Sequence, residues 1–173
     1  MNPRCLLFPL LLLLSLPAAA QLPSNEASVS LGRWDSSQLG DSPVFGASLN
    51  HYWSRARMLS TRVGVFGVHD GDVSVVAGQV GMGIHFFRSS RVSPWVGAGV
   101  AQAYTHLSES NDHFKGSEAV LTGIYSGGVD VAATPRFAVG AEFSYMNYGL
   151  EIGSRYGYSV DPMIMTVTGR WRF

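Results

Sequence analysis

The sequence has 173 residues, and its 12 Lys and Arg balance 12 Asp and Glu, so its formal net charge is zero. Such a balance gives no reason to expect a nucleic-acid partner. The only cysteine, Cys5, lies in the N-terminal leader described next. The rest of the chain therefore has no disulfide framework, thiolate metal site or cysteine nucleophile.

The first twenty residues have the three parts of a secretory signal peptide. Arg4 supplies the charge, Leu6 to Leu16 forms an apolar run, and three alanines precede Gln21. The run is shorter than the roughly 20 residues that a spanning helix needs, so a retained membrane anchor is the less favoured alternative. We predict cleavage between Ala20 and Gln21, which leaves residues 21–173 as one domain.

The remaining chain contains alternating stretches rather than any continuous apolar run long enough to span a membrane as a helix. Strict alternation with period two predicts strands, and stretches of about ten residues suit tilted strands that cross hydrocarbon. The predicted strands cover, in chain order, residues 27–34, 44–53, 58–68, 73–86, 94–106, 119–131, 136–148 and 162–173.

The last stretch shows the alternation most clearly. From Met163 to Phe173, apolar residues occupy every second position, and the positions between them are mostly polar and include Arg170 and Arg172. An apolar outside and a polar inside are typical of a barrel in lipid, whereas a soluble barrel has the reverse pattern and is the less favoured alternative. We therefore predict an all-β protein, an eight-stranded antiparallel up-and-down transmembrane β-barrel.

The lumen of an eight-stranded barrel is just wide enough to be filled by side chains. Charged groups inside it must pair, because an unpaired buried charge costs several kcal/mol. We predict a polar network in the lumen that consists of Arg62, Gln79, Gln102, Glu142 and Arg170. Such a network favours a packed plug over a gated conduction path.

Charges and aromatic residues divide between the two ends of the predicted barrel. Acidic residues gather in the first, third, fifth and seventh connections, which are mostly longer, and arginines gather in or beside the others. Aromatic residues and histidines near strand ends predict an interfacial girdle. Its predicted members are Trp34, His51, Tyr52, Trp53, His85, Phe86, Trp95 and Trp171.

Three segments resemble a known family. The segments are Pro94-Trp95-Val96-Gly97-Ala98-Gly99-Val100, Val139-Gly140-Ala141-Glu142-Phe143-Ser144-Tyr145 and Gly169-Arg170-Trp171-Arg172-Phe173. They are similar to the small outer-membrane β-barrels that include OmpA-type transmembrane domains and opacity porins. The resemblance implies a Gram-negative outer-membrane location. It also implies contact with outer-membrane lipid and lipopolysaccharide, and insertion by the assembly machinery, which reads the terminal aromatic residues Trp171 and Phe173.

We expect a monomer without catalysis, cofactor or metal site, whose extracellular loops have a structural, surface-interaction or adhesion role. The alternative is a narrow channel or carrier for small apolar molecules or ions. A lipid A-modifying hydrolase is less favoured. His106-Leu107-Ser108, with Glu118 or Glu142, resembles the His-x-Ser pairing of lipid A deacylases but lacks their Ser-Asn context.

Overall fold

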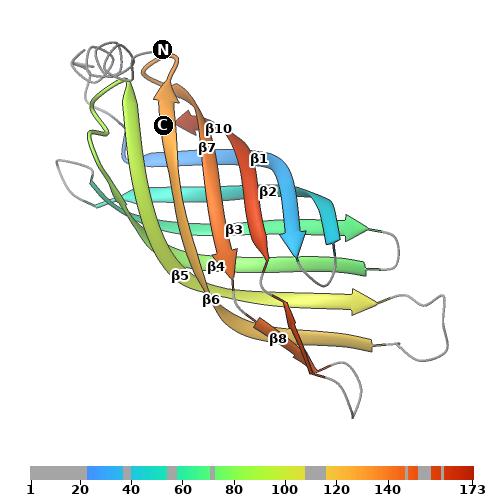
Figure 1. Ribbon diagram of the computed structural model, residues 1–173. Helices are drawn as coiled ribbons and strands as arrows, with labels where there is room; N and C mark the ends of the chain where they lie inside the picture. The colour runs from blue at the N-terminus through green and yellow to red at the C-terminus, as the bar shows by residue number, and fades with distance from the viewer. Residues whose placement is uncertain are drawn as a thin grey trace, which may run out of the picture.

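The computed structural model describes residues 23–36, 40–53, 58–70, 73–107, 116–146, 148–151, 157–160 and 162–173. The predicted signal peptide, with Ala20 and Gln21, lies outside these residues. Within the described part the chain is all-β, and eight antiparallel strands close into one barrel, which confirms the predicted fold class (Figure 1). No helix among these residues is long and apolar enough to cross a membrane.

The barrel strands follow one another around the wall in chain order. They are β1 (Asn25–Ser36), β2 (Gly40–Tyr52), β3 (Leu59–Asp70), β4 (Val73–His85), β5 (Val92–Leu107), β6 (Gly116–Ala132), β7 (Phe137–Met146) and β10 (Met163–Arg172), which closes on β1. Between β7 and β10, β8 (Tyr148–Glu151) and β9 (Gly157–Val160) form a separate two-stranded sheet that was not predicted.

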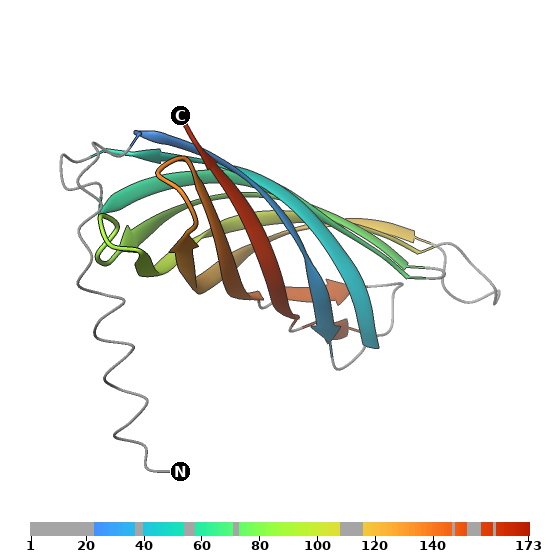
Figure 2. The same ribbon diagram turned by 90° about the horizontal axis from the view of Figure 1, so that it is seen from above.

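The strand register is regular around the barrel. Following paired residues from Leu31 through β2, β3, β4 and β5 leads to Ala119 on β6. The opposite path, through β10 and β7, leads to Val129, so the two paths differ by the ten positions from 119 to 129. This difference is the shear number of the barrel, and with eight strands it corresponds to a strand tilt of roughly 40°. Figure 2 shows the strands crossing the wall obliquely. Side chains therefore fill the narrow interior.

The two ends of the barrel differ in their connections. At the terminal end, Asn25 and Phe173 join their backbones by hydrogen bonds of 3.2 and 3.0 Å, and the connections from β2 to β3, from β4 to β5 and from β6 to β7 lie at the same end. At the loop end lie the connections 37–39, 71–72, 108–115 and 147–162. The first two of these are short, because β1, β2 and β3 extend further than predicted. The prediction of longer connections at this end was therefore wrong for the first of them, between β1 and β2.

The outer face of the barrel carries an apolar band. Leu121 is 72% exposed and Val29 66%, and outward residues on every barrel strand are similarly apolar. Monomeric proteins in water rarely expose so large an apolar surface, and an apolar band around the wall is what a barrel presents to hydrocarbon.

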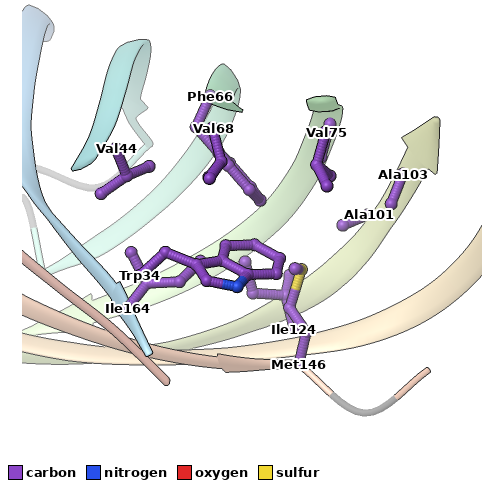
Figure 3. Packing of buried hydrophobic residues seen from close by; sticks show 11 residues of the cluster. Trp34, Val44, Phe66, Val68, Val75, Ala101, Ala103, Ile124, Met146 and Ile164 are labelled. Carbon is purple, nitrogen blue, oxygen red and sulfur yellow. The ribbon is translucent and has the colours of Figure 1, made fainter. Parts of the chain in front are cut away.

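The interior has an apolar layer near the loop end, where Trp34 is only 1% exposed (Figure 3). Its other members include Val44, Phe66, Val68, Val75, Ile124, Met146 and Ile164. On the outer face at this height, Arg33 forms an exposed ion pair with Asp41, and Asp35 is exposed as well. On β1 and β2 the polarity of the wall is thus reversed at the loop end. Between this layer and the terminal end, the lumen is polar.

Candidate functional site: the charged lumen

Four of the five side chains predicted to line the lumen point into it, from four different strands. They are Arg62 on β3, Gln79 on β4, Glu142 on β7 and Arg170 on β10.

Gln102 corrects the prediction, because it is exposed on the outer face. The inward positions of β5 around it are Ala101 and Ala103, which are fully buried. Since strand residues alternate between faces, Gln102 shares the outer face with Val100 and Tyr104.

Arg170 is the centre of the charged cluster, with its side chain 1% exposed. Its Nη1 donates a hydrogen bond to Oε1 of Glu26 at 3.2 Å, and its Nη2 donates to Oε2 of Glu142 at 3.3 Å. Its Nε lies 2.8 Å from Oδ1 of Asp130 and donates to Oγ1 of Thr168 at 3.3 Å. One planar guanidinium therefore joins carboxylates from β1, β6 and β7, a geometry that the lysine ammonium cannot reproduce.

Arg62 extends the cluster toward the apolar layer. Its Nη1 donates to Oε1 of Glu142 at 2.6 Å, and Ser144 donates to the same oxygen at 3.4 Å. Glu142 thus bridges Arg62 and Arg170 across the lumen, as the need to pair buried charges requires.

Glu26 is a second centre, which the sequence analysis missed because the predicted first strand begins one residue later. Its Oε2 accepts a hydrogen bond from Nε of Arg172 at 3.2 Å and lies 3.6 Å from Nη2 of Arg88. Its Oε1 accepts hydrogen bonds from Asn50 at 3.4 Å and from Tyr52 at 3.3 Å. Glu26 precedes Ser28 on the inward face, and this alternation could have identified it.

Arg88 reaches the cluster from the β4–β5 turn, where Phe87 has a positive φ of 54°, an uncommon conformation for a bulky side chain. The Arg88 guanidinium lies 3.3 Å from the centre of the Tyr52 ring and donates to the carbonyl oxygen of Pro23 at 3.3 Å. Burial lowers the pKa of Arg88 from its ordinary value, and Tyr52 and Glu26 oppose that shift. No local pattern in the sequence indicates that this turn folds back into the barrel.

Several aromatic residues assigned to the girdle lie in the interior instead: Trp34, Tyr52, His85 and Trp95 are all buried. Trp95 stacks on His85 with 5.7 Å between ring centres, and it lies 5.6 Å from the guanidinium of Arg62. Gly128 makes room for it, because an added Cβ there would lie 2.9 Å from the indole nitrogen. By contrast, Trp53, Phe86, Trp171 and Phe173 are exposed near the terminal end and fit a girdle.

Two small cavities of about 30 Å³ each flank Arg62. Each has room for one or two water molecules. Arg62 Nε and Trp95 Nε1 make no hydrogen bond to the part of the protein that the structure describes, and both residues line the first cavity. The cluster can therefore hold water between fixed charges, and neither of these two cavities is large enough for a substrate.

Of the residues that suggested a hydrolase, His106 and Glu142 are not brought together, whereas the backbone of Glu118 lies on β6 opposite Thr105, next to His106. His106 is exposed on the outer face of β5, whereas Glu142 points into the lumen and bonds two arginines. Glu142 therefore cannot orient His106. Ser108 and the side chain of Glu118 lie outside the described residues.

Comparisons with known proteins identify the fold. No family model and no curated protein sequence matches the chain. Among solved structures, Neisserial surface protein A aligns with a TM-score of 0.67 and 16% identity, over 86% of this chain and 96% of that one. The N-terminal β-barrel domain of Pseudomonas aeruginosa OprF aligns at 0.63 and 14%, over 87% and 99%.

The outer-membrane enzyme PagL aligns at 0.52 and 13%, over 86% and 99%. Enzymes and other membrane proteins thus share this architecture, and the fold alone does not assign an activity. The closed antiparallel wall, the apolar outer band and these alignments together show that the chain has the fold of the small eight-stranded outer-membrane β-barrels.

Proposed function

We propose that this protein is a closed barrel of the bacterial outer membrane that acts as a rigid scaffold and presents its loop end at the cell surface. The observation that carries the proposal is the filling of the lumen, with a charged cluster toward the terminal end and an apolar layer toward the loop end. A wall closed in this way offers its outer face and its connections for contact with other molecules.

The location is supported by the apolar outer band and by the kinds of protein that share the fold. Trp171 and Phe173 face outward at the terminal end, where assembly machinery could bind them before the barrel closes. The outer band suits a monomer surrounded by outer-membrane lipid and lipopolysaccharide. In this orientation the terminal end faces the periplasm and the loop end faces outward, as is usual for barrels with short periplasmic turns.

A surface role is favoured by what the loop end carries. The connections 108–115 and 147–162 are the longest ones, and the second includes the β8–β9 hairpin, whose backbone contacts β6. Surface connections held by a rigid wall are common sites of binding. We infer an interaction or adhesion role for these two connections.

The channel hypothesis is less well supported. An ion moving along the lumen would have to pass both the Arg62–Glu142 ion pair and the apolar side chains of Phe66 and Ile124. The hydrolase hypothesis is also disfavoured, because His106 lies on the outer face of the wall whereas Glu142 points into the lumen, and activation of a serine needs a base that a third group orients.

The test combines conductance with surface binding. We expect the refolded wild-type protein to give no ion current in a planar lipid bilayer. We also expect replacement of residues 108–115 by a Gly-Ser linker to abolish adhesion of expressing cells to a surface that binds the wild type. Arg33→Met, also at the loop end but on the barrel wall, is the matched control and should adhere normally. A reproducible current from the wild type would refute the closed scaffold.

A further inference from the structure

An open groove of about 590 Å³ lies on the outer face of β3 to β6, within the apolar band. Gly78 forms part of it, and a Cβ added there would meet nothing within 4 Å. Val80, Val100, Leu121 and Tyr104 line it with apolar surface. The volume falls in the range of ligand sites, and its opening faces the surrounding membrane.

Gln102 is the polar side chain on this outward surface. Its neighbours across the sheet are Gly78 on β4 and Leu121 on β6, and it makes no hydrogen bond with the described residues. Polar groups facing hydrocarbon are rare because water is not available there to satisfy them. The carboxamide therefore indicates an occupant that has a hydrogen-bonding group at this depth and apolar chains beside it.

Polar residues lie beyond the groove on the side of the loop end. His69 Nδ1 is 2.8 Å from Oγ of Ser74, and Ser74 pairs across the sheet with His106, which is also outward. From Val80 and Val100 toward the loop end, the wall thus presents apolar side chains and then the carboxamide of Gln102. The Tyr104 ring follows, and beyond it Ser74 lies between His69 and His106. An acyl chain, its ester or amide linkage and a phosphorylated headgroup have the same order of polarity.

We propose that this groove binds one molecule of lipid A, the acylated and phosphorylated lipid anchor of lipopolysaccharide. An acyl chain lies in the groove, its linkage bonds Gln102, and the phosphorylated sugar contacts Ser74 and His69. The choice of lipid A rests on the proposed function, because only a loop end that faces outward places the site in the outer leaflet.

A second copy of the chain fits the groove less well than a lipid. A two-fold contact between identical copies requires a self-complementary surface. Two copies of a concave groove centred on Gly78 would enclose empty space between them, whereas a flexible acyl chain can fill it.

The test uses the full mature protein refolded into phosphatidylethanolamine vesicles with hexa-acylated lipid A, followed by native mass spectrometry of the extracted protein. Wild type should retain one lipid A. Gly78→Leu fills the groove and should lower retention at least tenfold, and Gln102→Leu should lower it about tenfold, the equivalent of one hydrogen bond. Gly169→Leu is the control, since Gly169 faces outward on β10 and an added Cβ meets nothing closer than 3.8 Å.

Three outcomes would overturn the site: unchanged lipid A retention in both groove variants, equal retention of phosphatidylethanolamine, or a disulfide-linked dimer of Gln102→Cys in vesicles. The last variant is informative because the mature chain has no other cysteine. Heat-modifiability on gels verifies that each variant is folded. If one of these three outcomes occurs and the wild type gives no ion current, the lipid A site is refuted and the closed scaffold is not. A current from the wild type refutes the closed scaffold independently.

Discussion

Arg170→Met should be among the most destabilising substitutions in the barrel, because it removes the cation shared by three buried carboxylates. Without it, Glu26 keeps Arg88 and Arg172, and Glu142 keeps Arg62. Asp130, however, keeps no ion pair among the described residues. Removing one partner of a buried pair costs about 3–5 kcal/mol, and we expect a loss of that size in the free energy of unfolding.

The assay is urea unfolding of the refolded protein in lipid vesicles, followed by tryptophan fluorescence. Arg33→Met is the matched control, since the Arg33–Asp41 pair is 63% and 48% exposed and an exposed pair contributes about 1 kcal/mol or less. Adding Asp130→Asn to Arg170→Met should recover about 1–3 kcal/mol, because it neutralises the carboxylate left alone. A cost for Arg170→Met no larger than for Arg33→Met, or no recovery in the double variant, would refute the reasoning.

Three further substitutions test other parts of the barrel. Trp34→Ala should lower the free energy of unfolding by about 3–5 kcal/mol in the same urea assay, and a loss below 1 kcal/mol would contradict the tight apolar layer. Gly128→Val should lower it by about 1–3 kcal/mol and alter near-ultraviolet circular dichroism, because the new Cβ would lie 2.5 Å from the carbonyl oxygen of Ala141 and 2.9 Å from the indole nitrogen of Trp95; an unchanged spectrum would argue against this packing. Phe173→Ala should keep refolding in vitro near normal but reduce the folded band in cellular outer membranes, and an equal yield in cells would remove its assembly role.

The strands and most of their faces could be predicted from the sequence, because period-two alternation follows from backbone geometry. The last strand demonstrates this: Ile164, Thr168 and Arg170 are buried, and Met165 and Val167 are exposed, as the alternation requires. The pairing of Arg62 with Glu142 followed from a second physical argument, the cost of an isolated buried charge.

Gln102 shows where assignment by residue type alone leads to error. Its polar character suggested the lumen, but both faces of β5 are apolar nearby, with Ala101 and Ala103 inside and Val100 outside. The alternation that linked Gln102 to Val100 and Tyr104 was the better guide. The exception to the polar-in rule was itself informative, since it marks the proposed lipid site.

Trp95 and Arg88 could not be placed from local pattern, because their positions depend on volume inside the closed barrel. Glycines such as Gly97 and Gly128 leave space in the lumen, and large side chains must fill it. A tryptophan near a strand end suits an interfacial girdle equally well, so only the three-dimensional packing of the barrel separates the two. Arg88 enters from a turn, where no periodicity constrains side-chain direction.

The reversal of polarity along the wall relates the fold to the proposed role. In a membrane, a barrel needs an apolar outside and tolerates a polar lumen, whereas in water it needs an apolar core and a polar outside. Trp34 and Phe66 inside, with Arg33 and Asp41 outside, satisfy the second condition at the loop end. This part of the wall can therefore remain rigid beyond the hydrocarbon, where it would hold the connections clear of the membrane. A uniformly polar lumen would leave the same segment without a hydrophobic core in water.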